Sequence, residues 1–413
     1  MLDDLFPRAH ARYQSLRLLG AVVVDFESWL VERGFSRGAR AQKIRDIIRV
    51  ERFLVRRGKQ DSARIESTDL RACRAWYRRR NPSVAGTANS LRSFLRERDL
   101  LASPKPTVPS ATAVCVASYE AYLRNVRGLS PSSVKYQAYT ISRFLQHLGH
   151  DSRPSRLRHL TAKGVQRFVR MRGRSLSRGS LQHTVAHLRG FLRFLAASNA
   201  IRPGLDTQID TPRRYRLERV PRSLPWSVVL ALIQSVDRST PIGLRDYAMF
   251  CLMATYGLRA SQVVSLTLDD IHWRAGWIHV AERKNGVPLQ LPLIDNVATA
   301  LVRYLRRGRP PSPHREIFLR VRAPSGILKP TAVTETFQRW SRRSGLNIPY
   351  EGPHCIRHSY AVNLLRKGMS LKVIGDLLGH RTAESTCVYL RMDLDDLRNV
   401  ALPIPGKRKG VKT

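Results

Sequence analysis

Residues 352–361 read Gly-Pro-His-Cys-Ile-Arg-His-Ser-Tyr-Ala, and this stretch does most to decide the fold. The Gly-Pro pair and the apolar positions after it predict that a helix begins at about His354. His354 and Arg357 are three residues apart, so they project from one face of the first helical turn. That end of a helix carries positive potential. The stretch therefore predicts an anion site with a proton acceptor beside it.

His354 and His358 are also four residues apart, which is the spacing of a pair of zinc ligands. No Glu follows His354 directly and no third ligand is evident, which argues against zinc. We therefore expect no metal here, and we interpret His358 as a structural residue, hydrogen-bonded beneath the anion site.

Two further segments follow downstream. Residues 370–379 read Ser-Leu-Lys-Val-Ile-Gly-Asp-Leu-Leu-Gly, which predicts a helix capped by serine and ended by glycine, with His380 on the next turn. A second helix, about Glu384 to Met392, would carry Tyr389. A lone tyrosine in a helix is ordinarily a packing residue, so Tyr389 gains a chemical interpretation only from the residues around it.

Arg259 lies upstream, in the sequence Tyr-Gly-Leu-Arg. Gly257 predicts the end of one helix, and the apolar residues after Ala260 predict the start of another. Arg259 is then placed at a turn between helices, a position that suits contact with a phosphate.

Lys284 lies in the sequence Arg-Lys-Asn-Gly, between alternating segments 277–281 and 287–293. Asn-Gly is the strongest short signal for a hairpin turn. A lysine at a hairpin tip can reach into a substrate groove and supply a proton to a leaving alkoxide more readily than an arginine can. The alternative is an exposed polar turn residue.

The composition points to a polyanionic partner. The chain has 413 residues, 72 of them basic and 31 acidic, and a formal net charge of +41. Uncompensated positive charge opposes compaction, so DNA or RNA is the expected partner. The length predicts two or three domains.

The five cysteines are far apart and form no Cys-x-x-Cys pair, which favours reduced, intracellular thiols over a disulfide framework or a zinc site. The N-terminus lacks the pattern of a signal peptide, and the apolar runs are too short to span a bilayer. We expect a cytoplasmic protein without membrane contact.

Two proline-rich stretches divide the chain into helical segments and a C-terminal domain of helices and a hairpin. The second stretch is strongly basic; it could lie along a phosphate backbone or be a solvated tether. The expected parts are a helical domain at 1–101, a linker at 102–112, a helical domain at 113–202, a basic linker at 203–221, the C-terminal domain at 222–402 and a basic tail at 403–413.

The two helical segments share apolar residues in the same order at helical spacing, which suggests divergent copies of one plan. The offset drifts between 91 and 97 residues, so two unrelated bundles remain the alternative. The matching sets are Phe26, Trp29, Leu30, Phe53, Leu54, Leu91, Phe94 and Leu95, then Tyr119, Tyr122, Leu123, Phe144, Leu145, Leu188, Phe191 and Leu192.

The order of the chemical groups over residues 222–403 resembles that of the tyrosine recombinase (phage integrase) family. The resemblance is strengthened by Leu-Leu-Gly-His380 with a tyrosine nine residues later. It implies a mixed α+β catalytic domain with a small antiparallel sheet, and a helical core-binding (SAM-like) domain at 113–202. Residues 1–101 would be a second domain of that kind or an arm-type DNA-binding domain. The residues that carry the resemblance are Arg259, Lys284, His354, Arg357, His380 and Tyr389.

The resemblance implies that Tyr389 attacks the scissile phosphate and forms a 3′-phosphotyrosine, which frees a 5′-hydroxyl. Arg259 and Arg357 would hold the non-bridging oxygens as charge builds up. The covalent bond conserves the energy of the phosphodiester, so the resemblance implies neither ATP nor a metal nor any other cofactor.

The remaining roles follow in the same way. His354 would assist the tyrosine proton, Lys284 would protonate the leaving oxygen, and His380 would donate a hydrogen bond to the phosphate. Two positions depart from the family pattern. Gln262 replaces the usual acid, which could loosen Arg259 and slow the reaction, and Cys355-Ile356 replaces the commoner Asp-Leu or Gly-Leu.

The resulting hypothesis is a site-specific recombinase or integrase that acts on double-stranded DNA, for a mobile element. The resemblance implies a homotetramer on two duplexes, or a hetero-assembly with sister recombinases. The alternatives are a type IB topoisomerase-like enzyme and a non-catalytic DNA-binding accessory protein of the same fold.

Overall fold

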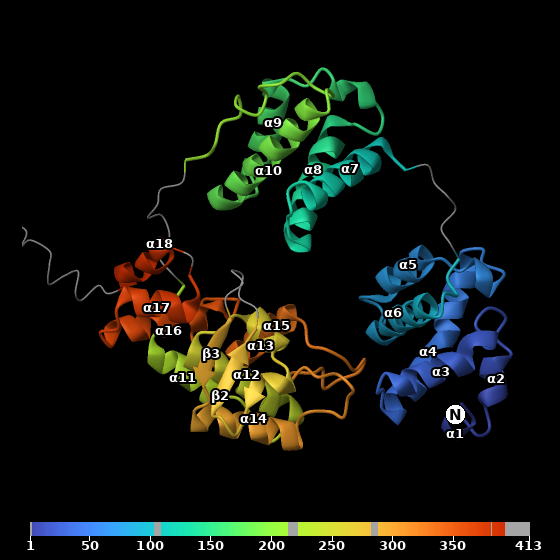
Figure 1. Cartoon of the computed structure of the whole chain (residues 1–413). Coiled ribbons are helices and arrows are strands. Elements are labelled where there is room, and N and C mark those ends of the chain that lie inside the picture. The colour runs from blue at the N-terminus through green and yellow to red at the C-terminus, as the bar shows by residue number, and fades with distance from the viewer. Residues whose placement is uncertain (1, 103–108, 214–221, 282–287, 381, 393–413) are drawn as a thin grey trace, which may run out of the picture. The chain divides into compact units, whose positions relative to one another are not determined.

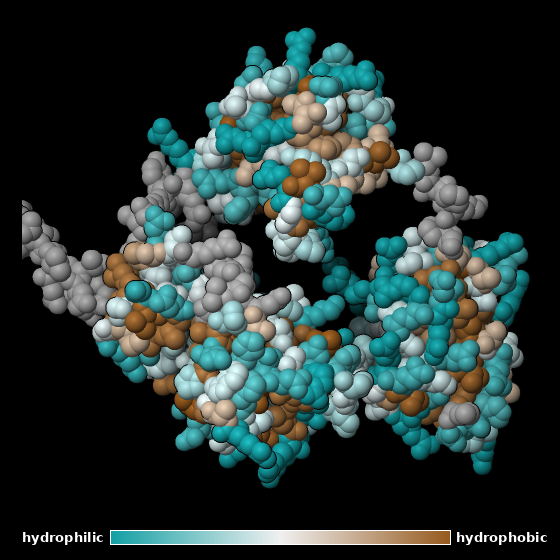
Figure 2. Space-filling view, viewed as in Figure 1, coloured by the Kyte–Doolittle hydropathy of each residue, from teal (hydrophilic) through white to brown (hydrophobic). Residues whose placement is uncertain are grey.

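The computed structural model describes residues 2–102, 109–213, 222–281, 288–380 and 382–392 (Figure 1). Lys284 and the hairpin turn, part of the basic linker, and the basic tail lie outside the described residues. Hydrophilic side chains cover much of the visible surface, with apolar residues showing in patches between them (Figure 2). No helix among the described residues is both long and apolar enough to cross a membrane.

The first helical segment encloses a core of its own, which includes Phe26, Ile47, Leu91 and Phe94, all fully buried. Ser36 caps the longest helix of this bundle through the backbone N–H of Ala39. Its elements are α1 Leu2–Leu5, α2 His10–Gln14, η1 Gly20–Val22, α3 Val23–Glu32, α4 Arg37–Arg56, η2 Ser62–Arg64, α5 Ser67–Tyr77 and α6 Pro82–Glu97.

The second helical segment likewise has a separate core around Phe144, Leu188 and Phe191. Ser130 caps α8 and Pro131 occupies its first turn. The elements are α7 Ala111–Asn125, α8 Pro131–Leu148, η3 Pro154–Leu157, α9 Ala162–Gly173 and α10 Arg178–Ala197.

Residues 203–213, which belong to the expected basic linker, lie on the second bundle. Ile209 is 2% exposed in the core of that bundle, Arg189 donates to its carbonyl at 2.6 Å, and Gln182 donates to the carbonyl of Pro212 at 2.9 Å. This part is therefore not a solvated tether, because it contributes an apolar anchor and accepts hydrogen bonds from α10.

The two bundles share one order of elements: a helix, a long helix, a 3-10 turn, a shorter helix and another long helix, α3 to α6 in the first and α7 to α10 in the second. Their buried positions also correspond with few exceptions. The fully buried Leu91 and Phe94 of α6 match Leu188 and Phe191 of α10. This agreement supports duplication of one four-helix unit.

The C-terminal domain packs its helices against a three-stranded antiparallel sheet of order β1-β2-β3. The predicted hairpin strands pair, with His279 opposite Gln290. The elements are α11 Trp226–Gln234, α12 Pro241–Tyr256, α13 Ala260–Ser265, η4 Leu268–Asp270, β1 Ile271–His272, β2 Trp277–Val280, β3 Leu289–Pro292, α14 Asp295–Arg307, α15 Pro330–Arg343, α16 His354–Arg366, α17 Leu371–Leu378, α18 Ala383–Cys387 and η5 Val388–Met392.

One expectation about this domain was wrong. The single helix expected from about Glu384 to Met392 ends at Cys387, and Tyr389 lies in the 3-10 segment that follows. Thr, Cys and Val at positions 386–388 are weak helix formers. The tighter turn delivers Tyr389 into a small core with Ile374 and Leu378.

Candidate active site

Gly257 and Gln262 fix the position of Arg259. Gly257 ends α12 in the left-handed conformation, with φ 64°, and a Cβ there would lie 2.6 Å from the ring of Tyr360. The backbone N–H of Arg259 donates to Oε1 of Gln262 at 2.9 Å, which closes the first turn of α13. Arg259 therefore lies at a turn between two helices, as predicted, and Gln262 anchors its backbone.

Arg357 is held from inside the domain. Its side chain is almost fully buried and donates to the carbonyl of Gly257 at 2.6 Å and to the carbonyl of Leu378. These contacts join the C-terminal ends of α12 and α17 through one guanidinium. A residue tied to two backbone carbonyls loses little entropy on meeting a phosphate, because its orientation is already set.

Tyr389 is 1% exposed. Its hydroxyl lies 3.0 Å from Nδ1 of His358, and its ring stacks on that of His380 with a centroid distance of 6.2 Å. Burial raises the pKa of the phenol, while the positive charges of Arg357 and Arg259 act in the opposite direction. The hydrogen bond to an imidazole distinguishes Tyr389 from a tyrosine that serves only to fill the core.

The imidazoles of the cluster are neutral at neutral pH. Burial, followed by neighbouring positive groups, lowers the pKa of His358 and of His380 to about 4, and it also lowers the pKa of His354. Nδ1 of His380 is bonded to Oγ1 of Thr386 at 2.9 Å, which fixes the ring beside Tyr389. Neutral imidazoles can accept protons without first losing one.

His354 and Arg357 both lie in the first turn of α16, as predicted. The imidazole bonded to Tyr389, however, belongs to His358, whose ring meets that of His354 edge-on at 4.5 Å. The expectation that His358 is hydrogen-bonded was right, but its partner is the tyrosine hydroxyl. The sequence analysis did not predict the contact between His358 and Tyr389. The only feature of the sequence that pointed to His358 was its position next to Arg357.

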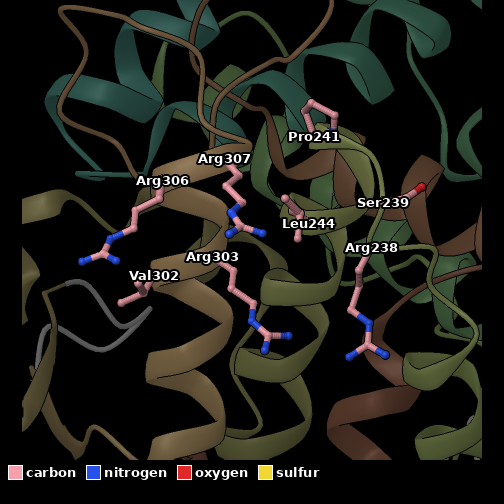
Figure 3. Close-up of a pocket in the computed structure, with 8 residues that line it drawn as sticks. All are labelled: Arg238, Ser239, Pro241, Leu244, Val302, Arg303, Arg306 and Arg307. Atoms are coloured by element: carbon pink, nitrogen blue, oxygen red, sulfur yellow. The ribbon is translucent and has the colours of Figure 1, made fainter.

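A basic hollow lies at the other end of α12. Figure 3 shows Arg303, Arg306 and Arg307 projecting from α14 beside Arg238. The 16 residues of α12 span about 24 Å, so this hollow, at the N-terminal end of the helix, is well separated from Gly257. It contains none of the six predicted site residues.

Two family models match parts of this chain. The model of the phage integrase family matches residues 222–395, and the model of the phage integrase N-terminal SAM-like domain matches residues 116–199. The integrase/recombinase y4rA of Sinorhizobium fredii is 34% identical over 394 residues, which cover 93% of this chain and 94% of the relative.

The chain belongs to the phage integrase family.

Members of this family are tyrosine recombinases, enzymes that transfer DNA strands, so the predicted family and enzyme class are confirmed. Tyrosine recombinase XerD of Listeria monocytogenes is a more distant relative, 29% identical over 280 residues, 66% of this chain and 92% of the relative.

Solved structures of integrase-family proteins share the fold. The recombinase XerH bound to its substrate has a TM-score of 0.56 at 17% identity, with 69% of this chain and 83% of the other covered. A lambda integrase dimer bound to a core site has a TM-score of 0.53 at 20% identity, with 67% and 94% covered. These likenesses confirm the predicted fold class.

Proposed function

We propose that the chain is a site-specific recombinase that cuts and rejoins duplex DNA through a 3′-phosphotyrosine at Tyr389. The observation that carries the proposal is the buried contact of 3.0 Å between the Tyr389 hydroxyl and Nδ1 of His358. In the same cluster, positive charge from Arg357 and Arg259 acts on the phenol. A tyrosine bonded to a neutral base beside two guanidiniums suits attack on a phosphodiester.

In the cleavage step, the Tyr389 oxygen forms a bond to the scissile phosphorus and the bond to the 5′-oxygen breaks. We propose that the tyrosine proton passes to Nδ1 of His358, which requires the tautomer in which this nitrogen is unprotonated and accepts the hydrogen bond. The leaving 5′-oxygen takes a proton, for which Lys284 is the proposed donor. Attack by another 5′-hydroxyl reverses these changes, so the number of phosphoester bonds is conserved.

Arg259 and Arg357 are proposed to bind the two non-bridging oxygens, and His380 to donate a hydrogen bond to the phosphate. The two hydrogen bonds from Arg357 to backbone carbonyls support this role, since they fix the orientation of the guanidinium before a phosphate binds. The proposed role of His354 is still to assist the tyrosine proton, now through His358, whose ring it meets edge-on at 4.5 Å.

The DNA partner and the assembly are part of the same proposal. Lambda integrase, which has this fold, has been solved as a tetramer bound to a Holliday junction, with a TM-score of 0.51. We propose a tetramer on two duplexes and a mobile-element substrate. The second is supported by the fold likeness to the Tn1549 transposon integrase, which was solved with circular intermediate DNA and has a TM-score of 0.50 at 18% identity. A cytoplasmic location is proposed along with a DNA substrate.

A supercoiled plasmid that carries two copies of the native recombination site tests the proposed function. We expect deletion or inversion of the segment between the sites, and no product from Tyr389→Phe. Relaxation without exchange would indicate a topoisomerase-like enzyme instead. Equal recombination by the wild type and Tyr389→Phe would show that Tyr389 is not the nucleophile. DNA binding without recombination or relaxation by the wild type would leave only an accessory role.

A further inference from the structure

The first helical bundle carries a surface for which the family matches give no role, because they cover residues 116–199 and 222–395. Its α4 and α5 border a groove, and we call this surface the arginine–tryptophan groove. We infer that the groove binds the phosphate backbone of duplex DNA. Its defining residues are Arg49, Arg52, Arg56, Arg57, Trp76 and Arg80.

Positive charge on this part of the bundle faces outward. Residues 49–80 include eleven basic and four acidic residues. Two of the acids point inward: Glu51 is buried and accepts hydrogen bonds from the backbone N–H groups of residues 17–19, and Asp69 is buried against Lys59 at 2.8 Å. Within the groove, Arg49 pairs with Asp46 at 3.4 Å and Arg57 with Asp69 at 3.5 Å. Arg52, Arg56 and Arg80 have no carboxylate partner among the described residues, so their charge is available to a ligand.

Arg49, Arg52 and Arg56 are spaced three and four residues apart, so they form one stripe along α4. No ion pair or hydrogen bond joins the side chains of Arg52 and Arg56 to other residues in the part of the chain that the structure describes. The stripe is about 10 Å long, and duplex DNA carries roughly one charge per 1.7 Å of its axis. The stripe can therefore meet more than one phosphate.

Trp76 is 50% exposed at the other wall of the groove. The guanidinium of Arg80 lies 4.1 Å above its ring, and Phe53 meets the same ring at 6.4 Å. The indole thus holds a cation in place rather than offering a free face to an unstacked base. This arrangement favours the backbone of a duplex over a single strand.

The second bundle has a basic groove at the corresponding place, between α8 and α9, and its lining includes His147, Arg170 and Met171. When the helices are matched by their buried positions, Trp76 falls at Met171, which is 41% exposed, and Arg56 falls at His147. Both copies therefore present a large apolar side chain among basic ones at the same position. A charged surface that only faces solvent would not be expected to repeat this combination of side chains in both bundles.

The test uses the full chain with Tyr389→Phe, which removes the proposed nucleophile, and a fluorescein-labelled 40-bp duplex of random sequence. Binding is measured by anisotropy over a salt series. Arg52→Ala with Arg56→Ala should weaken binding about tenfold or more and reduce the salt slope by about 2. The matched control is Arg8→Ala with Arg12→Ala, which removes the same charge from exposed residues beside and on α2, a helix that packs on α3.

Three results together would support DNA binding at the groove. The control variant should lose less affinity than the groove variant, and Arg52→Lys with Arg56→Lys should retain binding. The thermal unfolding of the groove alanine variant should be unchanged. Equal losses in the two alanine variants, or no loss in either, would overturn the inference. Tighter binding of a single-stranded 40-mer than of the duplex would also overturn it.

Photocrosslinking locates the contact directly. Benzoylphenylalanine at position 76 should crosslink to the duplex, whereas the same group at Val31 on α3, also 50% exposed, should not. Crosslinking at neither position, with DNA affinity unchanged by the arginine substitutions, would refute DNA binding at the groove and leave an acidic protein as its partner. These readouts do not involve strand cleavage, so they stand or fall separately from the proposed recombination.

Discussion

The hydroxyl of Tyr389 lies 3.0 Å from Nδ1 of His358, and the two residues are 31 positions apart in the sequence. This hydrogen bond joins the segment after α18 to the first turns of α16. It places a neutral imidazole beside the oxygen that would attack DNA. His358, and not His354 as first expected, is therefore the histidine that contacts the tyrosine hydroxyl.

His358→Ala should slow formation of the covalent DNA complex by about 100-fold while leaving DNA affinity nearly unchanged, because the substitution removes a proton acceptor and not a phosphate ligand. Single-turnover cleavage of a nicked duplex measures the rate, and anisotropy measures the affinity. His358→Gln is the control for packing. An alanine variant as fast as the wild type would rule out His358 as the acceptor.

Acid should destabilise the protein. Burial lowers the folded-state pKa of His358 and of His380 to about 4, below the value of 6.5 expected on unfolding. The unfolded chain therefore binds more protons between about pH 6.5 and pH 4, so the stability present above that window is lost as the pH falls through it.

Urea unfolding from pH 7.5 to pH 4.5 measures this loss. A variant with His358→Gln and His380→Gln should lose less of its free energy of unfolding over the same range than the wild type does. Parallel losses in the two proteins would show that other groups are responsible.

Gln262→Ala should cost about 1 kcal/mol of unfolding free energy, since the backbone N–H of Arg259 loses its acceptor at the start of α13. The cleavage rate should fall as well. Gln262→Glu should retain both, because a carboxylate accepts the same hydrogen bond at a helix N-terminus. Cleavage by Gln262→Ala at the wild-type rate would show that Arg259 is oriented by something else.

Gly257→Ala should destabilise the protein by about 2 kcal/mol or more, because φ is 64° and a Cβ would lie 2.6 Å from the Tyr360 ring. Gly276→Ala is a matched control with φ 71° and no atom within 4 Å of the new Cβ. It should cost only about 1 kcal/mol. Equal costs, measured by urea unfolding, would mean that the ring moves aside freely.

Local signals in the sequence predicted much of this domain. Gly257, Ser370 and Gly379 mark helix ends where the structure has them, because their effects depend on the backbone of adjacent residues. The hairpin strands followed from alternation and an Asn-Gly turn. Arg259 and His380 accordingly lie on turns, as expected.

Other features depend on tertiary contacts and could not be predicted in this way. The partner of His358 is 31 residues distant, and the small core that buries the Tyr389 ring also contains residues far from it in the sequence, such as Ile374 and Leu378. The burial of Ile209 in the second bundle likewise could not be predicted, because the prolines around it indicate a linker. Lys284 lies outside the described residues, so its role stays a prediction.

The most direct test of the central claim is to trap the covalent complex on a library of nicked duplexes, and to identify both the modified residue by mass spectrometry and the attached DNA end by sequencing. We predict Tyr389 joined to a 3′-phosphate, a free 5′-hydroxyl on the other fragment, and no adduct with Tyr389→Phe. An adduct at another residue, or a 5′-phosphate linkage, would contradict the account.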